Sequence, residues 1–275
     1  MDHAARRDAD PVRFAHRYEE PADQEVAAVI AACFAYGRVV GFTPVLERIF
    51  DTADARGGPR RWVDGFDPED DAASLASLVY RWNRGVDVSL LALSLKALLL
   101  EGVSLERHLP TNVDLADALD ALVLAMRSAA VQQAPALGLS ATSFAELPRG
   151  FRSFLPRPSD GSATKRWWMF LRWMVRPATE GVDLGLWATR RPSELLVPVD
   201  THVLRLSRFL GLTSRSDTSL RTAREITASL RAIDPVDPVR FDFALAHLGI
   251  SGACKGRRDD DICPACPLHG ACAVR

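Results

Sequence analysis

The chain has 275 residues, of which 48% are hydrophobic and 25% charged, with a formal net charge of −1. This composition supports one large or two modest cores and argues against the disordered and fibrous classes. Residues 1–20 are charged, and the longest apolar run, residues 90–100, is interrupted by Ser94 and Lys96, so we expect no signal peptide and no membrane span.

Helical periodicity dominates the first half of the chain. Apolar residues recur at helical spacing over residues 26–34, and Gly37 then offers a stop signal. Cys33 falls on the apolar stripe of this helix, which predicts a buried structural thiol. Further helices are predicted near residues 41–54, 72–83, 87–101 and 114–132.

The second half of the chain continues the helical pattern. Residues 132–160 are rich in small residues and proline and predict a loop, whereas residues 165–176 predict a tryptophan-rich amphipathic helix. Two more helices follow, one with capping-box spacing at Thr222 and one opened by Asp237 before a proline. Because only residues 195–199 resemble a strand, we predict an all-α protein.

Four of the five cysteines form a C-x8-C-x2-C-x5-C array at the C-terminal end of the sequence. Such a tight group of thiolates is typical of a soft metal centre, either zinc or iron-sulfur. An odd number of cysteines with this clustering fits a reducing cytosol better than a secreted disulfide scaffold, so we expect a cytoplasmic protein. The array consists of Cys254, Cys263, Cys266 and Cys272.

A carboxylate stands at the start of a predicted helix in the string Val-Asp-Thr-His-Val, residues 199–203. Taken alone, Asp200 is best explained as an N-cap worth about 1 kcal/mol, and His202 as a hydrogen-bonded structural residue. The same string followed by the cysteine array resembles the helix-hairpin-helix (HhH-GPD) DNA glycosylase superfamily, in particular its endonuclease III-like members. The resemblance is clearest over residues 198–272.

This resemblance implies that Asp200 is catalytic. A carboxylate at a helix N-terminus is held ionised by the helix dipole and by backbone N–H groups. Its charge would stabilise the oxocarbenium-like sugar that forms as the glycosidic bond breaks, or it would deprotonate the attacking nucleophile.

A second motif implies a lysine nucleophile. Residues 161–165, Gly-Ser-Ala-Thr-Lys, are similar to the Gly-x-Gly-x-Lys hairpin of strand-cleaving members, with alanine in place of the second glycine. Lys165 would then form a Schiff base with the sugar, aided by the neighbouring cation Arg166. A lysine that only contacts phosphate would explain the same pattern. The residues implied to contact DNA here are Gly161, Ser162, Ala163 and Arg166.

Two departures weaken the match to endonuclease III itself. Leu155 and Pro156 do not adjoin Gly161, and the interval from Lys165 to Asp200 is 35 positions, which is long for that group. Archaeal glycosylases specific for oxidised guanine, and a poorly characterised bacterial branch, are more similar in these respects. The resemblance therefore implies base excision, with an oxidised purine as the first expectation for the substrate.

The resemblance also implies further DNA contacts, from motifs that are less specific. Tyr36 or Arg38 would enter the duplex where a base has been flipped out, although Gly37 as a simple helix cap explains this turn equally well. Trp167 or Trp168 would stack on the extruded base. Lys255 and Arg257, beside the cysteine array, would contact phosphates.

The cysteine spacing resembles the [4Fe-4S] loop of endonuclease III relatives more than a zinc site, although the first interval here is eight residues instead of six. Charge favours DNA as a partner locally: residues 149–275 contain 20 Lys and Arg against 13 Asp and Glu, whereas residues 1–148 contain 14 against 22. An ordinary solvated surface would give a similar imbalance.

Together these features predict a monomeric, nucleoid-associated enzyme with two helical lobes, residues 22–194 and residues 195–275 with 1–21. Double-stranded DNA with a damaged base would bind between the lobes, where Lys165 and Asp200 face each other. The predicted activity is a DNA glycosylase with associated AP-lyase activity. Two alternatives are a monofunctional glycosylase in which Asp200 activates water, and a non-catalytic iron-sulfur protein that binds nucleic acid.

Overall fold

The computed structural model describes residues 7–250, Cys254 and residues 256–273, and this part of the chain is predominantly helical. The all-α prediction is thereby confirmed at the level of fold class. No helix within the described residues is long and apolar enough to cross a membrane. The α-helices are α2 (Pro21–Phe34), α3 (Val39–Ala55), α4 (Pro59–Asp64), α5 (Asp70–Leu75), α6 (Gly85–Leu98), α7 (Leu115–Gln133), α8 (Arg149–Phe154), α9 (Lys165–Val175), α10 (Thr201–Phe209), α11 (Leu220–Arg231) and α12 (Asp242–Ile250).

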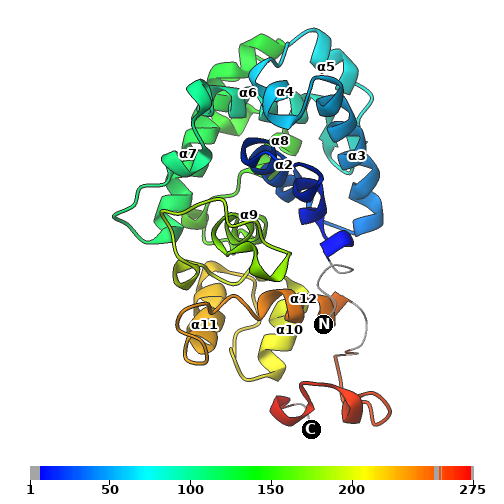
Figure 1. Cartoon of the computed structure of the whole chain (residues 1–275), viewed down its shortest axis with the longest axis vertical. Coiled ribbons are helices and arrows are strands. Elements are labelled where there is room, and N and C mark those ends of the chain that lie inside the picture. The colour runs from blue at the N-terminus through cyan, green and yellow to red at the C-terminus, as the bar shows by residue number, and fades with distance from the viewer. Residues whose placement is uncertain (1–6, 251–253, 255, 274–275) are drawn as a thin grey trace.

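Helix α2 lies among the other helices of the upper part of Figure 1 and is buried on almost every side. Pro21 occupies its first turn, where the missing N–H costs no hydrogen bond. Its sequence is apolar all round after Glu25, as expected for an enclosed helix. Cys33 is 3% exposed, which confirms the buried thiol, and burial raises its pKa to about 12.

The predicted helix near residues 72–83 is wrong. Helix α5 ends at Leu75, and the chain then forms an antiparallel hairpin of β1 (Val79–Tyr80) and β2 (Asn83–Arg84). Arg81 adopts a left-handed conformation with φ of 52°, which makes the two-residue turn. The strand-like residues 195–199 pair with no strand in the described structure, and the Val197 N–H donates to Thr227 Oγ1 at 3.0 Å instead.

Two predicted helix starts are also corrected. Helix α11 begins at Leu220 because Ser219, not Thr222, is its N-cap. Helix α12 begins at Asp242, several residues after Asp237, whose carboxylate is engaged in an ion pair with Arg176 at 2.9 Å. The polar side chain that reads as a cap in the sequence is therefore used in a tertiary contact.

The two ends of the molecule meet at α9. Helices α3 to α8 gather at the upper end in Figure 1, and α10, α11 and the C-terminal segment lie at the lower end. The connection between α8 and α9 is fixed to the start of α11: the Leu220 N–H donates to Gly161 O at 3.0 Å, and Ser162 and Ser219 form an isolated β-bridge. This contact sets the first turn of α9 close to the start of α10.

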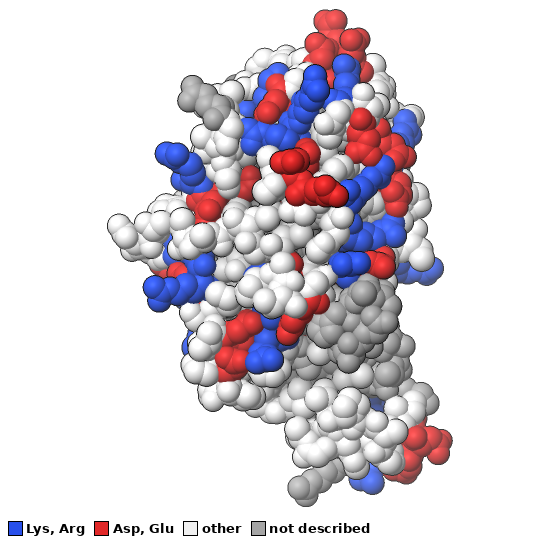
Figure 2. All heavy atoms as spheres, viewed as in Figure 1, with Lys and Arg blue, Asp and Glu red and all other residues white. Residues whose placement is uncertain are grey.

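Charge is mixed on the face of the molecule shown in Figure 2. Acidic and basic side chains lie beside one another over the upper lobe, and an uncharged area occupies the centre of this face. Several exposed charges of the described residues form ion pairs, as Arg17 does with Asp51 at 3.0 Å. The excess of basic residues in the second half of the sequence does not produce one large basic area on the face shown.

Candidate functional site

Lys165 and Asp200 form an ion pair. Lys165 is the first residue of α9 and Asp200 is the N-cap of α10, and Lys165 Nζ lies 2.8 Å from Asp200 Oδ2. The other oxygen, Asp200 Oδ1, accepts the N–H groups of His202 and Val203, both at 2.9 Å. Residues 35 positions apart in sequence are therefore in direct contact, with side chains 31% and 20% exposed.

The carboxylate of Asp200 is held in its charged form. Burial alone would raise the pKa of Asp200, but the Lys165 ammonium and the two backbone N–H groups outweigh it and lower that pKa. The group is thus an anion at neutral pH, placed next to a primary amine. A carboxylate in this position is able to accept a proton from Lys165 or to stabilise positive charge on a bound group.

Thr164, directly before Lys165, has a strained backbone. Its φ of 42° and ψ of 43° lie in the left-handed region, which costs a non-glycine residue about 1–2 kcal/mol. The residue is 3% exposed, and its Oγ1 has no hydrogen-bond partner in the described structure. Strain of this kind is frequent at functional sites, where the surrounding structure holds the backbone in place. Here it turns the chain into α9 and sets the position of Lys165.

Two pockets meet at Lys165. The outer pocket has a volume of about 530 Å³ and is open to solvent on one side. Its lining includes Asp200 and His202 from α10, the loop residue Tyr36, and Ser162 and Thr164 from the segment before α9. Lys165, Ala35 and Gly37 line both this pocket and a second, deeper one.

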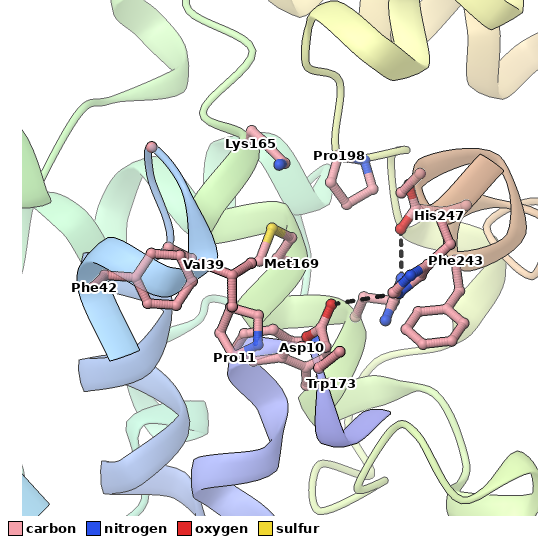
Figure 3. Close-up of a pocket in the computed structure, with 16 residues that line it drawn as sticks. Asp10, Pro11, Val39, Phe42, Lys165, Met169, Trp173, Pro198, Phe243 and His247 are labelled. Atoms are coloured by element: carbon pink, nitrogen blue, oxygen red, sulfur yellow. Dashed lines mark hydrogen bonds and ion pairs between the residues drawn. The ribbon is translucent and has the colours of Figure 1, made fainter. Parts of the chain in front are cut away.

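The inner pocket has a volume of about 260 Å³. Figure 3 shows Lys165 and Pro198 at one side of it, Met169 in the centre, and Phe42 and Phe243 on opposite walls. Its residues come from the segment before α2, the start of α3, α9 and α12. A pocket with aromatic and aliphatic walls of this size accommodates one flat heterocyclic group.

Charged groups gather at the inner end of this pocket. Arg172 is 4% exposed in its side chain, pairs with Asp183 at 3.0 Å, and forms a second, close ion pair with Asp242. His247 Nε2 lies 4.0 Å from Asp10 Oδ2 (Figure 3). Burial raises the pKa of Asp242 to about 6 and also raises the pKa of Asp10, in both cases against the attraction of Arg172.

Two buried polar atoms, in residues that line the inner pocket, have no hydrogen-bond partner in the described structure. Asp242 Oδ1 accepts no hydrogen bond and Trp173 Nε1 donates none within the described structure, although both side chains are buried. Both residues line the inner pocket. A buried polar atom without a partner costs about 1–3 kcal/mol. A ligand with one donor and one acceptor on its edge would recover part of this cost.

The expectation for the tryptophans at the start of α9 is wrong. Trp167 is 2% exposed and donates its Nε1–H to Phe154 O at 3.1 Å, and Trp168 is fully buried. Neither residue lines the outer or the inner pocket, so neither is able to stack on an extruded base. The aromatic wall comes instead from Trp173, two helical turns further along α9, and from Phe42 and Phe243.

The predicted phosphate contacts in the hairpin are also corrected in part. The Arg166 guanidinium donates to Cys33 O and Ser153 O, so it joins α2 to α8 instead of facing solvent. Ala163 is 3% exposed and its N–H donates to Thr218 O at 3.3 Å. Gly161 and Ser162 are exposed, and Ser162 lines the outer pocket.

The loop between α2 and α3 divides the two pockets. Tyr36 lines the outer pocket but is only half-exposed, because its hydroxyl donates to Asn83 Oδ1 and its ring stacks on Trp82. Arg38 is exposed and has no ion pair with any described residue. Both positions are adjacent to the ion pair of Lys165, and their roles in DNA binding stay predictions.

The four clustered cysteines have free thiols that are partly exposed. Four thiols are suitable donors for an iron-sulfur cluster or zinc. Within the described residues no three His, Cys, Asp or Glu side chains come together as a metal site, and both the iron-sulfur cluster and zinc stay predictions. The loop packs on α10, where Arg205 donates to Cys254 O at 3.5 Å and the Ala273 N–H donates to Phe209 O at 2.6 Å.

Of the two basic residues predicted to contact phosphates beside the cysteines, the structure describes only Arg257. Lys255 lies outside the described residues. Arg257 is exposed and lines neither pocket. A phosphate contact by Arg257 would therefore be remote from Lys165.

Several residues of the site gave little signal in the sequence. Asp10 lies before the first predicted helix, and Asp242 falls inside an apolar segment where it reads as an ordinary surface charge. Only Arg172 could be recognised from the sequence, because it interrupts the apolar face of the helix at residues 165–176. A buried charge at such a position requires buried partners. The identity of those partners depends on contacts between distant segments.

The fold and the site thus define a helical protein in which a Lys–Asp ion pair lies where a shallow and a deep pocket meet. The chain belongs to the DUF2400 family, described as a protein of unknown function, whose family model matches residues 10–251. No curated protein and no solved structure matches the chain.

Proposed function

We propose that this protein is a DNA glycosylase with associated AP-lyase activity that removes a damaged base, with an oxidised purine as the first candidate. The observation that supports the proposal most directly is the contact between Lys165 Nζ and Asp200 Oδ2 at 2.8 Å, at the junction of the two pockets. The amine is a nucleophile, the carboxylate is a base, and the inner pocket is a separate space for the leaving group.

The chemistry requires only these two side chains at the sugar. Asp200 accepts a proton from the Lys165 ammonium, and the neutral amine attacks C1′ of the deoxyribose. A C–N bond to Lys165 forms as the glycosidic bond breaks, and the base leaves with its bonding electrons and takes up the proton that Asp200 had accepted, which restores the Asp200 carboxylate. The Asp200 carboxylate stabilises the positive charge that develops on the sugar. The amine then loses a second proton as the C1′–O4′ bond opens and O4′ takes up a proton, which gives the Schiff base. Loss of a proton from C2′ of the Schiff base expels the 3′ phosphate and cleaves the strand.

The inner pocket would hold the extruded base. Enzymes that act on a base in duplex DNA take it out of the stack and bind it between aromatic or apolar side chains. Phe42, Met169 and Phe243 supply such walls, and Lys165 stands at the entrance. Asp242 Oδ1 and Trp173 Nε1 offer the unsatisfied acceptor and donor for the edge of the base.

Borohydride trapping tests the proposal sharply because the chain has only three lysines, Lys96, Lys165 and Lys255. Borohydride reduces the Schiff base to a stable amine, so a covalent protein–DNA adduct should form on duplexes that carry a single lesion. We expect Lys165→Ala to abolish the adduct, and Asp200→Asn to slow it by about 10²- to 10⁴-fold. Lys96→Ala and Lys255→Ala are the matched controls and should cross-link like the parent.

Other outcomes assign the alternatives. Excision without an adduct, retained in Lys165→Ala and lost in Asp200→Asn, would indicate a monofunctional glycosylase in which Asp200 activates water. Binding to lesion-containing duplex without any turnover in the parent would contradict the enzymatic proposal and leave a nucleic-acid-binding protein.

A further inference from the structure

Trp82, in the turn between β1 and β2, is exposed and held in a fixed orientation. It is 42% exposed, whereas each of the other five tryptophans is at most 4% exposed. Its ring stacks on Tyr36 with centroids 5.3 Å apart and an interplanar angle of 13°. Its Nε1–H donates to Ser153 Oγ at 3.0 Å. A large aromatic surface is thus presented to solvent without the loss of side-chain entropy on binding that a mobile side chain would incur.

Two exposed arginines, Arg149 and Arg81, lie over the stacked rings of Trp82 and Tyr36. Arg149 lies over the Trp82 ring at 5.6 Å and Arg81 over the Tyr36 ring at 5.8 Å, while Arg84 and Arg152 are exposed nearby in sequence on β2 and α8. None of these four arginines has an ion pair with a residue that the structure describes. Some exposed arginines elsewhere, such as Arg17 and Arg240, are paired with carboxylates.

The acidic group closest in the chain does not neutralise them. Asp87 is 1% exposed and turned inwards, where it accepts the N–H groups of Arg84 at 2.8 Å and Phe151 at 2.9 Å. The surface around Trp82 therefore keeps its positive charge. A cationic surface around an exposed aromatic ring is complementary to phosphates with an unpaired base between them.

This surface continues into the outer pocket. Tyr36, on which Trp82 stacks, and Ser153, to which it donates, both line that pocket together with Lys165. We infer that Trp82, Tyr36, Arg81 and Arg149 form a binding site for an unpaired nucleotide of a DNA strand. The base stacks on the exposed part of the indole and the arginines bind the adjoining phosphates.

The inference rests on the proposed function in so far as DNA is the ligand, and it adds a second subsite to it. The nucleotide at Trp82 is not the one that enters the inner pocket. It is a neighbour on a strand whose pairing is lost, so the site favours single-stranded or locally opened DNA over an intact duplex.

Tryptophan fluorescence tests this directly. Because Trp82 alone among the six tryptophans has a substantial exposed fraction, a stacked base should quench its emission and protect it from iodide. The titration uses the full chain with Asp200→Asn, so that no turnover occurs, and an unmodified single-stranded oligonucleotide as the probe. We expect quenching that saturates with binding and is absent from Trp82→Phe.

Affinity measurements give the second readout. Trp82→Ala should weaken binding of the oligonucleotide roughly 5- to 150-fold, the range for the loss of one base stack. Val79→Ala, on the same hairpin and 58% exposed, is the control and should bind like the parent. Arg149→Gln should lower the slope of log affinity against log salt by about 1, whereas Arg107→Gln, also exposed and unpaired in the described structure, should not.

Two results would overturn the inference: quenching that persists in Trp82→Phe, or unchanged affinity and salt slope in Trp82→Ala and Arg149→Gln. Unfolding curves of each variant show whether a weaker affinity reflects loss of structure. Absence of borohydride trapping with intact Trp82 quenching would count against the proposed function alone. Base excision without any Trp82 quenching would count against this inference alone.

Discussion

Asp242 is the residue that most directly links the pocket to substrate choice. Its carboxylate is bound to Arg172 on one side and has an unsatisfied Oδ1 on the other, in a residue that lines the inner pocket. If a base enters the pocket, this oxygen is an acceptor for its N–H groups. An abasic site has no base to present, so Asp242 should not affect strand cleavage at such a site.

Asp242→Asn should therefore separate the two activities. We expect excision of an oxidised purine to fall about 10- to 100-fold, the effect of one lost hydrogen bond to a charged group, while cleavage at a preformed abasic site changes little. The measurement is the ratio of the two rates in the same protein preparation, which is independent of the folded fraction.

Asp183→Asn is the matched control for that ratio. Asp183 also pairs with Arg172, at 3.0 Å, but does not line the inner pocket. This variant should lose stability without a change in the ratio of excision to abasic-site cleavage. Equal loss of both activities in Asp242→Asn would mean that Asp242 has no contact with the base.

At the scale of elements, the junction of the β-hairpin, α6 and α8 is the tightest contact that positions the site. Asp87 joins these three elements through its bonds to Arg84 and Phe151. A Cβ at Gly150 would overlap the Asp87 carboxylate and would lie 2.8 Å from Trp82 O. Glycine is required here by space and not by a left-handed backbone, since Gly150 has no positive φ.

Gly150→Ala should accordingly destabilise the protein by about 1–3 kcal/mol, the cost of overpacking. Gly138→Ala tests the effect of a left-handed backbone alone, because Gly138 has φ of 70° but no heavy atom within 4 Å of an added Cβ. This substitution should cost about 1 kcal/mol of stability. Gly270→Ala meets neither obstacle and should be close to neutral. Urea unfolding of the three variants measures the differences, and equal values for Gly150→Ala and Gly270→Ala would refute the steric argument.

The same elements show what the sequence is able to predict. Helices with long apolar repeats, such as α2, α7 and α9, were predicted within a few residues of their bounds, because their buried faces recur at helical spacing. The hairpin at residues 79–84 was missed because its turn depends on a left-handed Arg81, a residue with no turn preference. Asp200 as a helix N-cap was predicted correctly because capping is a local interaction.

The site was predictable only where a motif was recognised. Lys165 and Asp200 were selected through resemblance, and the structure places their side chains in contact. Trp167 and Trp168 were predicted to bind the base because aromatic residues stack on bases. The position of a tryptophan along α9 decides whether it lines the pocket, and Trp173 is the one that does. Fewer than two helical turns separate these core residues from the pocket residue, and composition does not distinguish them.

For the whole molecule, the open question with the clearest measurement is the metal. We keep the [4Fe-4S] cluster as a proposal because four thiols occur in one short segment, although the described conformation does not gather three of them. Protein purified without oxygen should contain about four iron and four sulfide per chain, and Cys266→Ser should lose them. Cys33→Ser is the control, since that thiol is buried in α2. One zinc per chain and no iron would support the zinc alternative instead.

The charged residues around Arg172 come from parts of the chain that are synthesised at different times. Asp10, Arg172 and Asp242 come from segments far apart in the order of synthesis, and all three border the inner pocket. A growing polypeptide that has emerged as far as α10 already contains its amine and its acid, but it lacks the wall that α12 contributes. The Lys165–Asp200 ion pair therefore precedes the complete inner pocket during translation, and a chain that ends before α12 would contain both residues but lack one wall of that pocket.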